Sequence, residues 1–558
     1  MNSRNNHIIE KVFLEVNTKN IDFAYSVRDN ARSFLDDIFL PVLEAVLEKY
    51  NISDTVLRFD RLDVDISTGN AVSLDDTENM KFYFRSQFED VLKQHISGVE
   101  SSMGDMPAGN KILQNESIEK NIEKVGVEEN SFESNARRRT VQDNRKSIFL
   151  FFLENGSLPW YGKKDDITGF VSSKEWGQSL EDPGFLSSVT FLISSDRGAR
   201  IRFTEYLSDD AITKFLIRKS SDSKGVLSLL EKIVGTTGTI RHAGTSRHVR
   251  TVKHAGTTRH AKTVQDAGII RGEGKSPGST LLKMLVELSL AKSVNEVQKI
   301  LVRFEKEPFF TVIKRSWEEF EQMLKNILPV EVQTDVKVHE LLDVFSRENR
   351  PATEPTILKN ENKKVFEEKN KEEEETEYST TEEKSFFPHK TGQKEISVKN
   401  AGLILLHPFF KSLFSEIGVL DKNGGIVSDK TDIAVQTLHF IAAGDEDFFE
   451  GDLVLDKFLC NVPLKWPVTQ QSQLTDAIKS EVNVMLKEVI KHWPALKNTS
   501  PEGLRQMFIA RDGKLIEQEN GFKLIVERKA QDVLLEKLNW NISMVKLPWR
   551  KELITVEW

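Results

Sequence analysis

Three long polar stretches divide this chain of 558 residues and limit where a hydrophobic core can form. Residues 98–146, 234–280 and 347–395 are dominated by polar and charged side chains. Such segments bury too little apolar surface to offset the entropy that is lost on ordering. We therefore predict a disordered polar linker, a basic repeat spacer and an acidic linker there, in that order. Folded blocks are expected in the four remaining ranges, 1–97, 147–233, 281–346 and 396–558.

The first block has the patterns of a small β-α-β-α module. Residues 12–16 alternate between two faces, which is typical of a half-buried strand. Apolar residues then recur at three- and four-residue spacing over residues 34–47, which predicts a helix with one apolar face. Pro41 lacks an amide hydrogen and crowds the preceding turn, so a kink or break is expected near Leu40. A second strand and a second amphipathic helix are predicted at residues 62–66 and 84–91.

The later blocks differ in kind. Apolar clusters separated by polar breaks predict short packed helices in 147–233 and 281–346. In the last block, apolar residues recur with a helical period over residues 474–489. Ser500 is a residue type that favours the N-cap of a helix, and Pro501 is one that favours the first helical position. Asn520-Gly521 lies between two apolar runs and predicts a hairpin turn. The predicted fold class is therefore multi-domain α+β.

A tandem repeat occupies the basic stretch. Residues 242–253 and 254–265 match at eight of twelve positions, yet each unit holds too few large apolar residues to stack as a solenoid. A duplicated spacer is the better interpretation. Residues 239–275 carry eight Arg or Lys and two acids, a local charge of +6. This segment could contact a polyanion through counterion release, or an acidic protein surface such as the chain's own residues 366–383, which carry −7.

Composition excludes several classes of protein. The formal net charge of −9 gives no overall electrostatic support for nucleic-acid binding. Cys460 is the single cysteine, so no intrachain disulfide can form, and its apolar setting predicts a buried, inert thiol. The N-terminal residues lack the pattern of a secretory signal, and the apolar run 148–153 is too short to span a bilayer. These features predict a cytoplasmic protein without membrane insertion.

No residue is nominated as catalytic, cofactor-binding or metal-binding. The repeat histidines have no acidic or thiol partner in their units, and residues 268–276 miss the spacing of a phosphate-binding loop by one residue. Asp63 and Asp65 share a strand face and could form an acid/base pair, but a solvated face is the simpler interpretation. Five tryptophans occur in the last block, where such side chains mostly fill cores. Trp549 and Trp558 are the candidates for an interaction site.

The two ends of the chain resemble the tape measure family of extracellular contractile injection systems. The N-terminal resemblance lies in residues 7–16 (HIIEKVFLEV) and 57–65 (LRFDRLDVD). The C-terminal resemblance is stronger and lies in residues 401–410 (AGLILLHPFF), 492–505 (HWPALKNTSPEGLR), 511–515 (RDGKL), 547–549 (LPW) and 556–558 (VEW).

This resemblance implies a structural assembly protein of a phage-tail-like particle, not an enzyme, that sets tube length from within the tube lumen. Inner tube and baseplate proteins are the implied partners, with self-association as a further option and no specific nucleic acid. The implied location is the cytoplasm during assembly and then the particle. If residues 98–395 were wholly helical they would span ~450 Å, and fully extended they would span ~1,000 Å.

Two other functions stay open at this point. One is a tube-end adaptor or assembly factor that binds particle ends without measuring length. The other is an effector loaded into the particle, for which no active-site pattern argues. A simple ruler would have one uninterrupted helix or coil, whereas the middle of this chain has helical clusters and a repeat.

Overall fold

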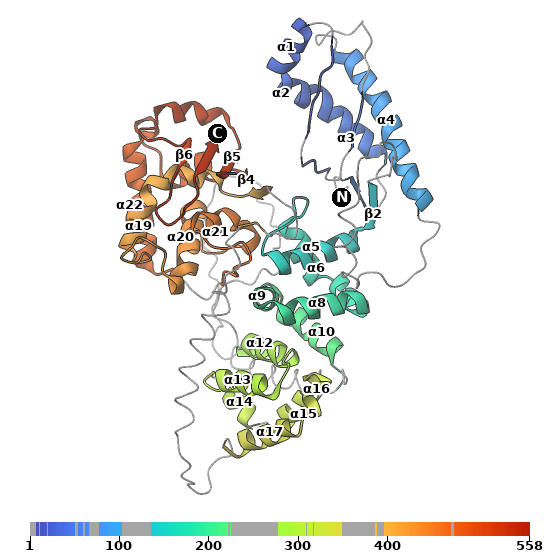
Figure 1. The fold of residues 1–558 in the computed structure, drawn as a ribbon, viewed down its shortest axis with the longest axis vertical. Helices are drawn as coiled ribbons and strands as arrows, with labels where there is room; N and C mark the ends of the chain where they lie inside the picture. The colour runs from blue at the N-terminus through green and yellow to red at the C-terminus, as the bar shows by residue number, and fades with distance from the viewer. Residues whose placement is uncertain are drawn as a thin grey trace, which may run out of the picture. The chain divides into compact units, whose positions relative to one another are not determined.

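The chain divides into two compact units, Met1–Ser147 and Ile148–Trp558, and each has its own apolar core. The multi-domain α+β fold class predicted from the sequence is confirmed. The computed structural model describes the following residues (Figure 1): 7–10, 12–18, 21–50, 54–59, 62–65, 77–102, 136–220, 224, 277–307, 310–315, 317–348, 386–387, 395–469 and 474–558. The tandem repeat, the basic segment 239–275 and the acidic run 366–383 lie outside them.

Helices packed beside a two-stranded ribbon make up the first unit. The stripe predicted over residues 34–47 faces its core and packs against Phe84, Phe88 and Leu92 of the next long helix. Its buried members are Phe34, Ile38, Val42, Leu43 and Val46, and Leu35, Phe39 and Leu47 are partly buried against the core. The elements are α1 (Ile21–Asp29), α2 (Ala31–Phe34), the π-helical turn η1 (Leu35–Phe39), α3 (Leu40–Lys49), β1 (Thr55–Phe59), α4 (Thr77–Ser102) and β2 (Ala136–Thr140).

Near Leu40, where a kink or break is predicted, the helical backbone continues and changes type. The chain passes from α2 through η1 into α3, and Pro41 occupies the first turn of α3. Because proline provides no amide hydrogen, the regular i to i−4 ladder cannot run through this position. A π-helical turn just before it accommodates the lost hydrogen bond while the apolar stripe stays on one face.

The predicted strands of the first unit are wrong in position. Residues 12–18 and 62–65 form no strand, and β1 instead pairs antiparallel with β2, with Leu57 opposite Arg138. Alternation of apolar and polar residues indicates which face of a sheet each side chain would occupy. A strand also needs a neighbouring strand with which its backbone forms hydrogen bonds. That partner is 81 positions along the chain from Leu57, so local pattern could not identify it.

Part of the predicted polar linker 98–146 is ordered secondary structure. Helix α4 ends at Ser102, β2 covers Ala136–Thr140, and α5 (Val141–Asn155) begins directly afterwards. The polar strand ARRRT contributes little to an apolar core and is instead held by its ladder with β1. Pairing with an existing strand therefore orders a segment whose composition predicts a linker.

Short helices fill the first half of the second unit, as predicted. We call residues 148–348 the helical block. Side-chain oxygens of Ser173, Asp182, Asp196 and Ser208 accept hydrogen bonds from the first turns of four successive helices, so each polar break begins the next helix. The helices are α6 (Lys164–Ser172), α7 (Lys174–Glu181), α8 (Pro183–Ser195), α9 (Arg197–Tyr206), α10 (Asp209–Lys219), α12 (Pro277–Ser289), α13 (Val294–Phe304), α14 (Phe310–Arg315), α15 (Trp317–Ile327), α16 (Val330–Gln333) and α17 (Val336–Glu348).

The two predicted helical clusters share one apolar core. Buried residues from α5 to α17 form a single cluster, in which Trp176 is fully buried and donates to the carbonyl of Ala211. The Lys219 ammonium at the end of α10 donates to the carbonyl of Ser289 at the end of α12. Ser220 Oγ donates to the carbonyl of Asn326 at 3.1 Å. The basic stretch between the clusters therefore starts and ends on the same folded body.

We call residues 386–558 the C-terminal block. Its five-stranded sheet has the order β3-β4-β5-β7-β6, with β5 and β7 parallel and the other pairs antiparallel. The elements are β3 (Glu395–Val398), η5 (Ala401–Leu406), α19 (His407–Glu416), η6 (Ser428–Lys430), α20 (Thr431–Ala443), η7 (Glu450–Asp452), α21 (Val454–Leu459), α22 (Asp476–His492), η8 (Pro494–Leu496), α23 (Pro501–Leu504), η9 (Arg505–Ile509), β4 (Gly513–Gln518), β5 (Gly521–Val526), η10 (Ala530–Lys537), β6 (Met544–Val545) and β7 (Ile554–Glu557).

Local predictions hold in the C-terminal block. Helix α22 buries Val482, Met485 and Val489 along the predicted stripe. The Ser500 hydroxyl accepts from the Gly503 amide at 3.1 Å, with Pro501 next to it as the first helical residue. Strands β4 and β5 form the predicted hairpin, with Gly521 at a φ of 135°. These features depend only on neighbouring residues, which is why sequence patterns find them.

Gly402 offers a test of the packing in this block. A Cβ atom at Gly402 would lie 1.7 Å from the carbonyl oxygen of Phe508, which is backbone and cannot move alone. We expect Gly402→Ala to destabilise the second unit by at least ~2 kcal/mol, because the two segments must separate. Thermal unfolding of the full chain would measure this. Gly169→Ala is the matched control, because its Cβ would meet nothing within 4 Å; equal effects of the two variants would contradict the packing.

Candidate functional site

The segment between α20 and α21 inserts into the helical block. Phe449 is 2% exposed and belongs to the core of the helical block. Its ring stacks on Phe152 of α5, with centroids 4.9 Å apart and planes at 25°, and meets Tyr206 of α9 edge to face at 5.5 Å. Such aromatic pairs add to the free energy of burial. Phe449 is thus an apolar anchor between two blocks that are far apart in sequence.

The next residue, Glu450, is the centre of a buried ionic cluster that we define as Arg202, Glu450 and Lys457. Glu450 Oε1 accepts hydrogen bonds from Arg202 Nε at 3.1 Å and from Lys457 Nζ at 2.6 Å. The three side chains are at most 1% exposed. Burying such charges is costly unless they are paired and hydrogen-bonded, and here one carboxylate pairs with two cations.

Backbone groups from both blocks complete the cluster. Arg202 Nη1 donates to the carbonyl of Leu153 at 2.7 Å, and Nη2 donates to the carbonyl of Lys465. The Glu450 amide donates to the Tyr206 hydroxyl at 2.8 Å, and Lys457 Nζ donates to the carbonyl of Leu464 at 3.0 Å. Arg202 therefore holds together the end of α5, η7 and the segment after α21.

Local structure explains why these side chains meet. Asp196 caps α9 and fixes the start of the helix that carries Arg202. Helix α5 ends just before Gly156, which has a φ of 67°, a conformation that favours glycine. A Cβ at Gly156 would lie 2.6 Å from both Arg202 Nη2 and Glu450 Oε1. Glycine is therefore needed there both for the backbone turn and for the space the cluster occupies.

Burial shifts the pKa values around the cluster. Desolvation lowers the pKa of Lys457 to about 8; the positive charge of Arg202 adds to this shift and Glu450 opposes it. Desolvation also raises the pKa of Asp456, the neighbour of Lys457 on α21, to about 8, with Asp452 adding to the rise. No described residue hydrogen-bonds to either carboxylate oxygen of Asp456. At neutral pH, Asp456 is therefore mostly protonated.

The candidate interaction residue Trp549 packs within the C-terminal block. Its indole N–H donates to the carbonyl of Leu459 at 2.7 Å, and its ring stacks on Phe414 with centroids 5.1 Å apart. The side chain is partly buried against the core. The structure thus places Trp549 between α21 and α19, where its ring contributes to packing.

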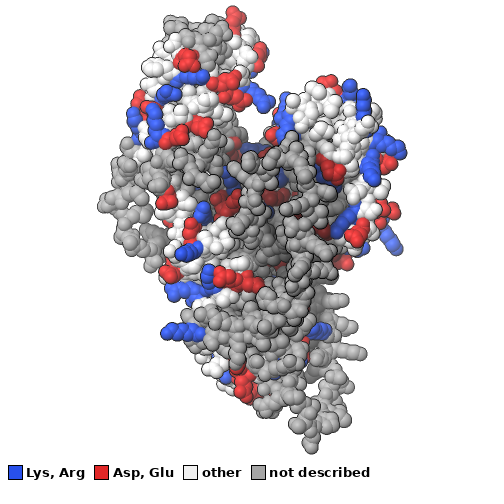
Figure 2. Space-filling view, turned by 180° about the vertical axis from the view of Figure 1, so that it is seen from behind, with Lys and Arg blue, Asp and Glu red and all other residues white. Residues whose placement is uncertain are grey.

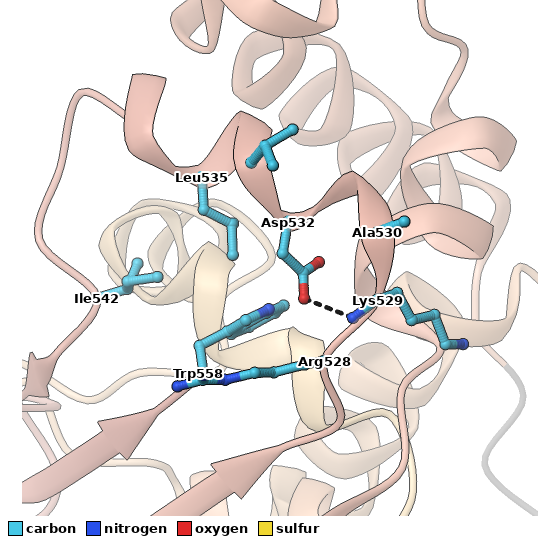
Figure 3. Close-up of a pocket in the computed structure, with 8 residues that line it drawn as sticks. Arg528, Lys529, Ala530, Asp532, Leu535, Ile542 and Trp558 are labelled. Carbon is cyan, nitrogen blue, oxygen red and sulfur yellow. Dashed lines mark hydrogen bonds between the residues drawn. The ribbon is translucent and has the colours of Figure 1, made fainter. Parts of the chain in front are cut away.

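The other candidate, Trp558, lines a pocket that we call the tryptophan pocket. Its cavity volume is about 540 Å³. In Figure 3 the Trp558 ring and the Arg528 side chain lie beside each other below η10. The remaining lining residues are Lys529, Ala530, Asp532, Val533, Leu535 and Ile542.

Polar contacts fix one wall of the tryptophan pocket. Asp532 accepts from the Lys529 amide at 2.7 Å and from Arg511 Nη2 at 2.8 Å (Figure 3 draws the first of these). The Arg511 guanidinium carbon lies 5.9 Å from the Trp558 ring centroid, within the range of a cation–π contact. Val533 is 66% exposed, and no described residue accepts a hydrogen bond from the buried Trp558 indole nitrogen. The pocket combines an apolar surface with polar groups able to fix an orientation.

Other sequence candidates lie apart from these two sites. Cys460 is 3% exposed, so its predicted burial is confirmed, and this burial raises the pKa of its thiol. Asp63 and Asp65 are exposed residues of the first unit. The repeat histidines and residues 268–276 lie outside the described part of the chain. Figure 2 shows acidic and basic side chains interspersed over the face in view.

The described residues contain neither a grouped set of metal ligands nor a membrane-spanning helix. Among them, no group of three or more His, Cys, Asp or Glu side chains is arranged to hold a metal ion. No helix within the ranges given above combines the length and apolar character needed to cross a membrane.

Comparison with known families identifies the class of protein. A family model described as contractile injection system tape measure protein matches residues 6–558. The chain therefore belongs to the contractile injection system tape measure protein family, and the resemblance noted from its two ends is confirmed over both units. No curated protein and no solved structure matches the chain.

The ionic cluster went unpredicted, although one signal was available. Asp456 and Lys457 interrupt the apolar run 453–460 (LVLDKFLC), and charges inside such a run often mark buried, paired side chains. Arg202 has no comparable signal, and it lies 248 positions from Glu450.

The protonation of Asp456 predicts a pH dependence of stability. Between about pH 4 and 8 the folded chain retains a proton on Asp456 that the unfolded chain releases, so the free energy of unfolding should fall as pH rises. Lys457 has the opposite effect only above about pH 8, where the folded chain releases its proton first. Asp456→Asn removes the first titration and should flatten the slope.

Urea unfolding of the full chain between about pH 5 and 7.5 would measure this slope. Asp476→Asn is the control, because Asp476 is fully exposed in the first turn of α22 and should keep the wild-type slope. Identical slopes for the wild type and Asp456→Asn would show that Asp456 is charged in the folded state.

Proposed function

We propose that the chain is a structural, non-enzymatic component of a contractile injection system that sets tube length from within the tube lumen. The observation that carries this proposal is the extent of the family match, which covers residues 6–558 and so includes both units and all three polar stretches. On this proposal the partners are inner tube and baseplate proteins, with self-association as a further contact. The chain is made in the cytoplasm and then enclosed in the particle.

A tube-end adaptor is the second candidate function. The observation that favours it is the closed form of the second unit, in which Arg202 contacts Glu450 across 248 positions of sequence. A folded body of this kind can bind a particle end without measuring anything. The two functions differ in whether particle length depends on the number of residues between the blocks.

Changes in the length of the acidic stretch, which joins the two blocks in the sequence, separate the two functions. Deleting residues 366–377 should shorten the tube by ~18 Å if the segment is helical in the particle, or by ~40 Å if it is extended. Inserting one, two or four further copies of this segment should lengthen the tube in proportion. Electron microscopy of purified particles would give the length distributions.

The control for this series replaces residues 366–377 by a scrambled sequence of the same composition, which should leave tube length unchanged. A constant length across all insertions would exclude the ruler. If deletion of residues 396–558 also abolished assembly, the adaptor would then be the better function.

We also propose that the tryptophan pocket contacts a particle protein. Trp558→Ala should reduce the amount of this chain found in purified particles, because the variant removes the ring that lines the cavity. Quantitative immunoblotting of particles would measure the loss, and circular dichroism would show whether the fold persists. Trp549→Ala should instead lower thermal stability, because this ring stacks on Phe414.

The matched control is Val484→Ala on α22, which removes a 50% exposed apolar side chain outside the tryptophan pocket. Equal incorporation of the Trp558→Ala and Val484→Ala variants would argue against the pocket as a contact.

A further inference from the structure

In the folded chain, the distance between the blocks does not depend on the number of residues in the connecting loops. Strand β1 pairs with β2, so residues 60–135 start and end at one ribbon. Lys219 contacts Ser289, so the basic stretch starts and ends on the helical block. Arg202 contacts Glu450, which closes residues 203–449 into a loop that includes the acidic stretch. Residues added to any of these loops leave the contacts at its base in place.

A ruler requires the opposite behaviour, because its span must grow with the number of residues. This step rests on the ruler function proposed above. If the chain measures length, at least one of these loops must open during assembly. The contact between the helical and C-terminal blocks controls the longest of the three.

The chemistry of that contact suits it to open. The cores of both blocks consist of apolar side chains, whose exposure to water carries a large penalty. At the contact, much of the Coulomb attraction within the ionic cluster offsets the desolvation of its three charges. On opening, Arg202, Glu450 and Lys457 regain their hydration, so the main apolar loss is the insertion of Phe449 beside Phe152.

The cluster also makes the closed form specific. Arg202 reaches Glu450, Leu153 and Lys465 at once, which fixes the angle and depth at which Phe449 inserts. A site that is specific in geometry but modest in net stabilisation can be displaced by a competing contact on either block.

We propose that Arg202, Glu450 and Lys457 form a latch that holds the second unit closed before assembly and opens when the chain enters the growing tube. Opening separates the helical block from the C-terminal block while the two apolar cores remain folded. The acidic stretch between the two blocks then contributes to the span of the chain.

A cross-link across the contact tests this latch. Lys164 on α6 lies near Asp452, since its charge affects the pKa of that carboxyl, and its Nζ is 6.0 Å from the Phe449 ring centroid. Both residues are partly exposed, whereas the native Cys460 is buried. The double variant Lys164→Cys/Asp452→Cys can therefore be bridged by a short bismaleimide, and the two single variants treated alike are the controls.

We expect loss of native-length particles when the bridged chain is supplied, and native particles from the unbridged double variant and both controls. Native-length particles that contain the bridged chain would overturn the latch. The insertion series in the acidic stretch decides the ruler separately: a tube length that follows the number of inserted residues despite the bridge would leave the ruler in place without a latch. A constant length would remove the ruler whatever the bridge does.

A second variant tests the closed form without assembly. Glu450→Gln leaves two buried cations without their carboxylate, so the full chain should open and its radius of gyration by small-angle X-ray scattering should rise, with helicity retained. Glu446→Gln is the matched control, because Glu446 pairs with Lys479 at 2.8 Å on the surface. An unchanged radius for Glu450→Gln, or a rise accompanied by loss of helicity, would contradict a latch that opens between folded blocks.

Discussion

The insertion of Phe449 and Glu450 into the helical block is the contact on which the second unit depends. Phe449 enters the apolar core beside Phe152, and Glu450 meets Arg202 and Lys457 one residue later. Because the Phe449 ring and the Glu450 carboxylate belong to adjacent residues, neither can move without the other. This pairing gives the contact strong geometric specificity, while much of the Coulomb attraction offsets the desolvation of its charges.

The second unit is held together in two different ways, by apolar packing within each block and by paired charges between the blocks. Within the blocks, continuous apolar cores hold the helices together, and the core of the helical block runs from α5 to α17 across a polar stretch of the chain. Between the blocks, paired charges take a larger share of the contact. The apolar cores persist unless a block unfolds. The charged groups between the blocks, in contrast, can exchange their protein partners for water.

Sequence patterns predicted the features that depend on neighbouring residues. The stripe over residues 34–47, the α22 stripe and the Asn520-Gly521 turn all reflect local spacing or backbone preference, and all are present. Residues 12–16 show the limit of this approach, because their alternation would require a pairing partner to form a strand. The ionic cluster shows the same limit, since no local sequence pattern connects Arg202 to Glu450. The family match came from residue identities at both ends, which carry information that periodicity lacks.

Folding and length measurement place opposite demands on one chain. A compact fold brings distant residues together, as when Arg202 meets Glu450, and so hides the number of residues between them. In a length-determining protein, the span of the chain must depend on that number of residues. Both demands can be met if the apolar cores stay folded while one contact between them opens, and the stretch that joins the two blocks becomes part of the span. The division of this chain into apolar blocks joined by a buried ionic contact has the features that such a solution requires.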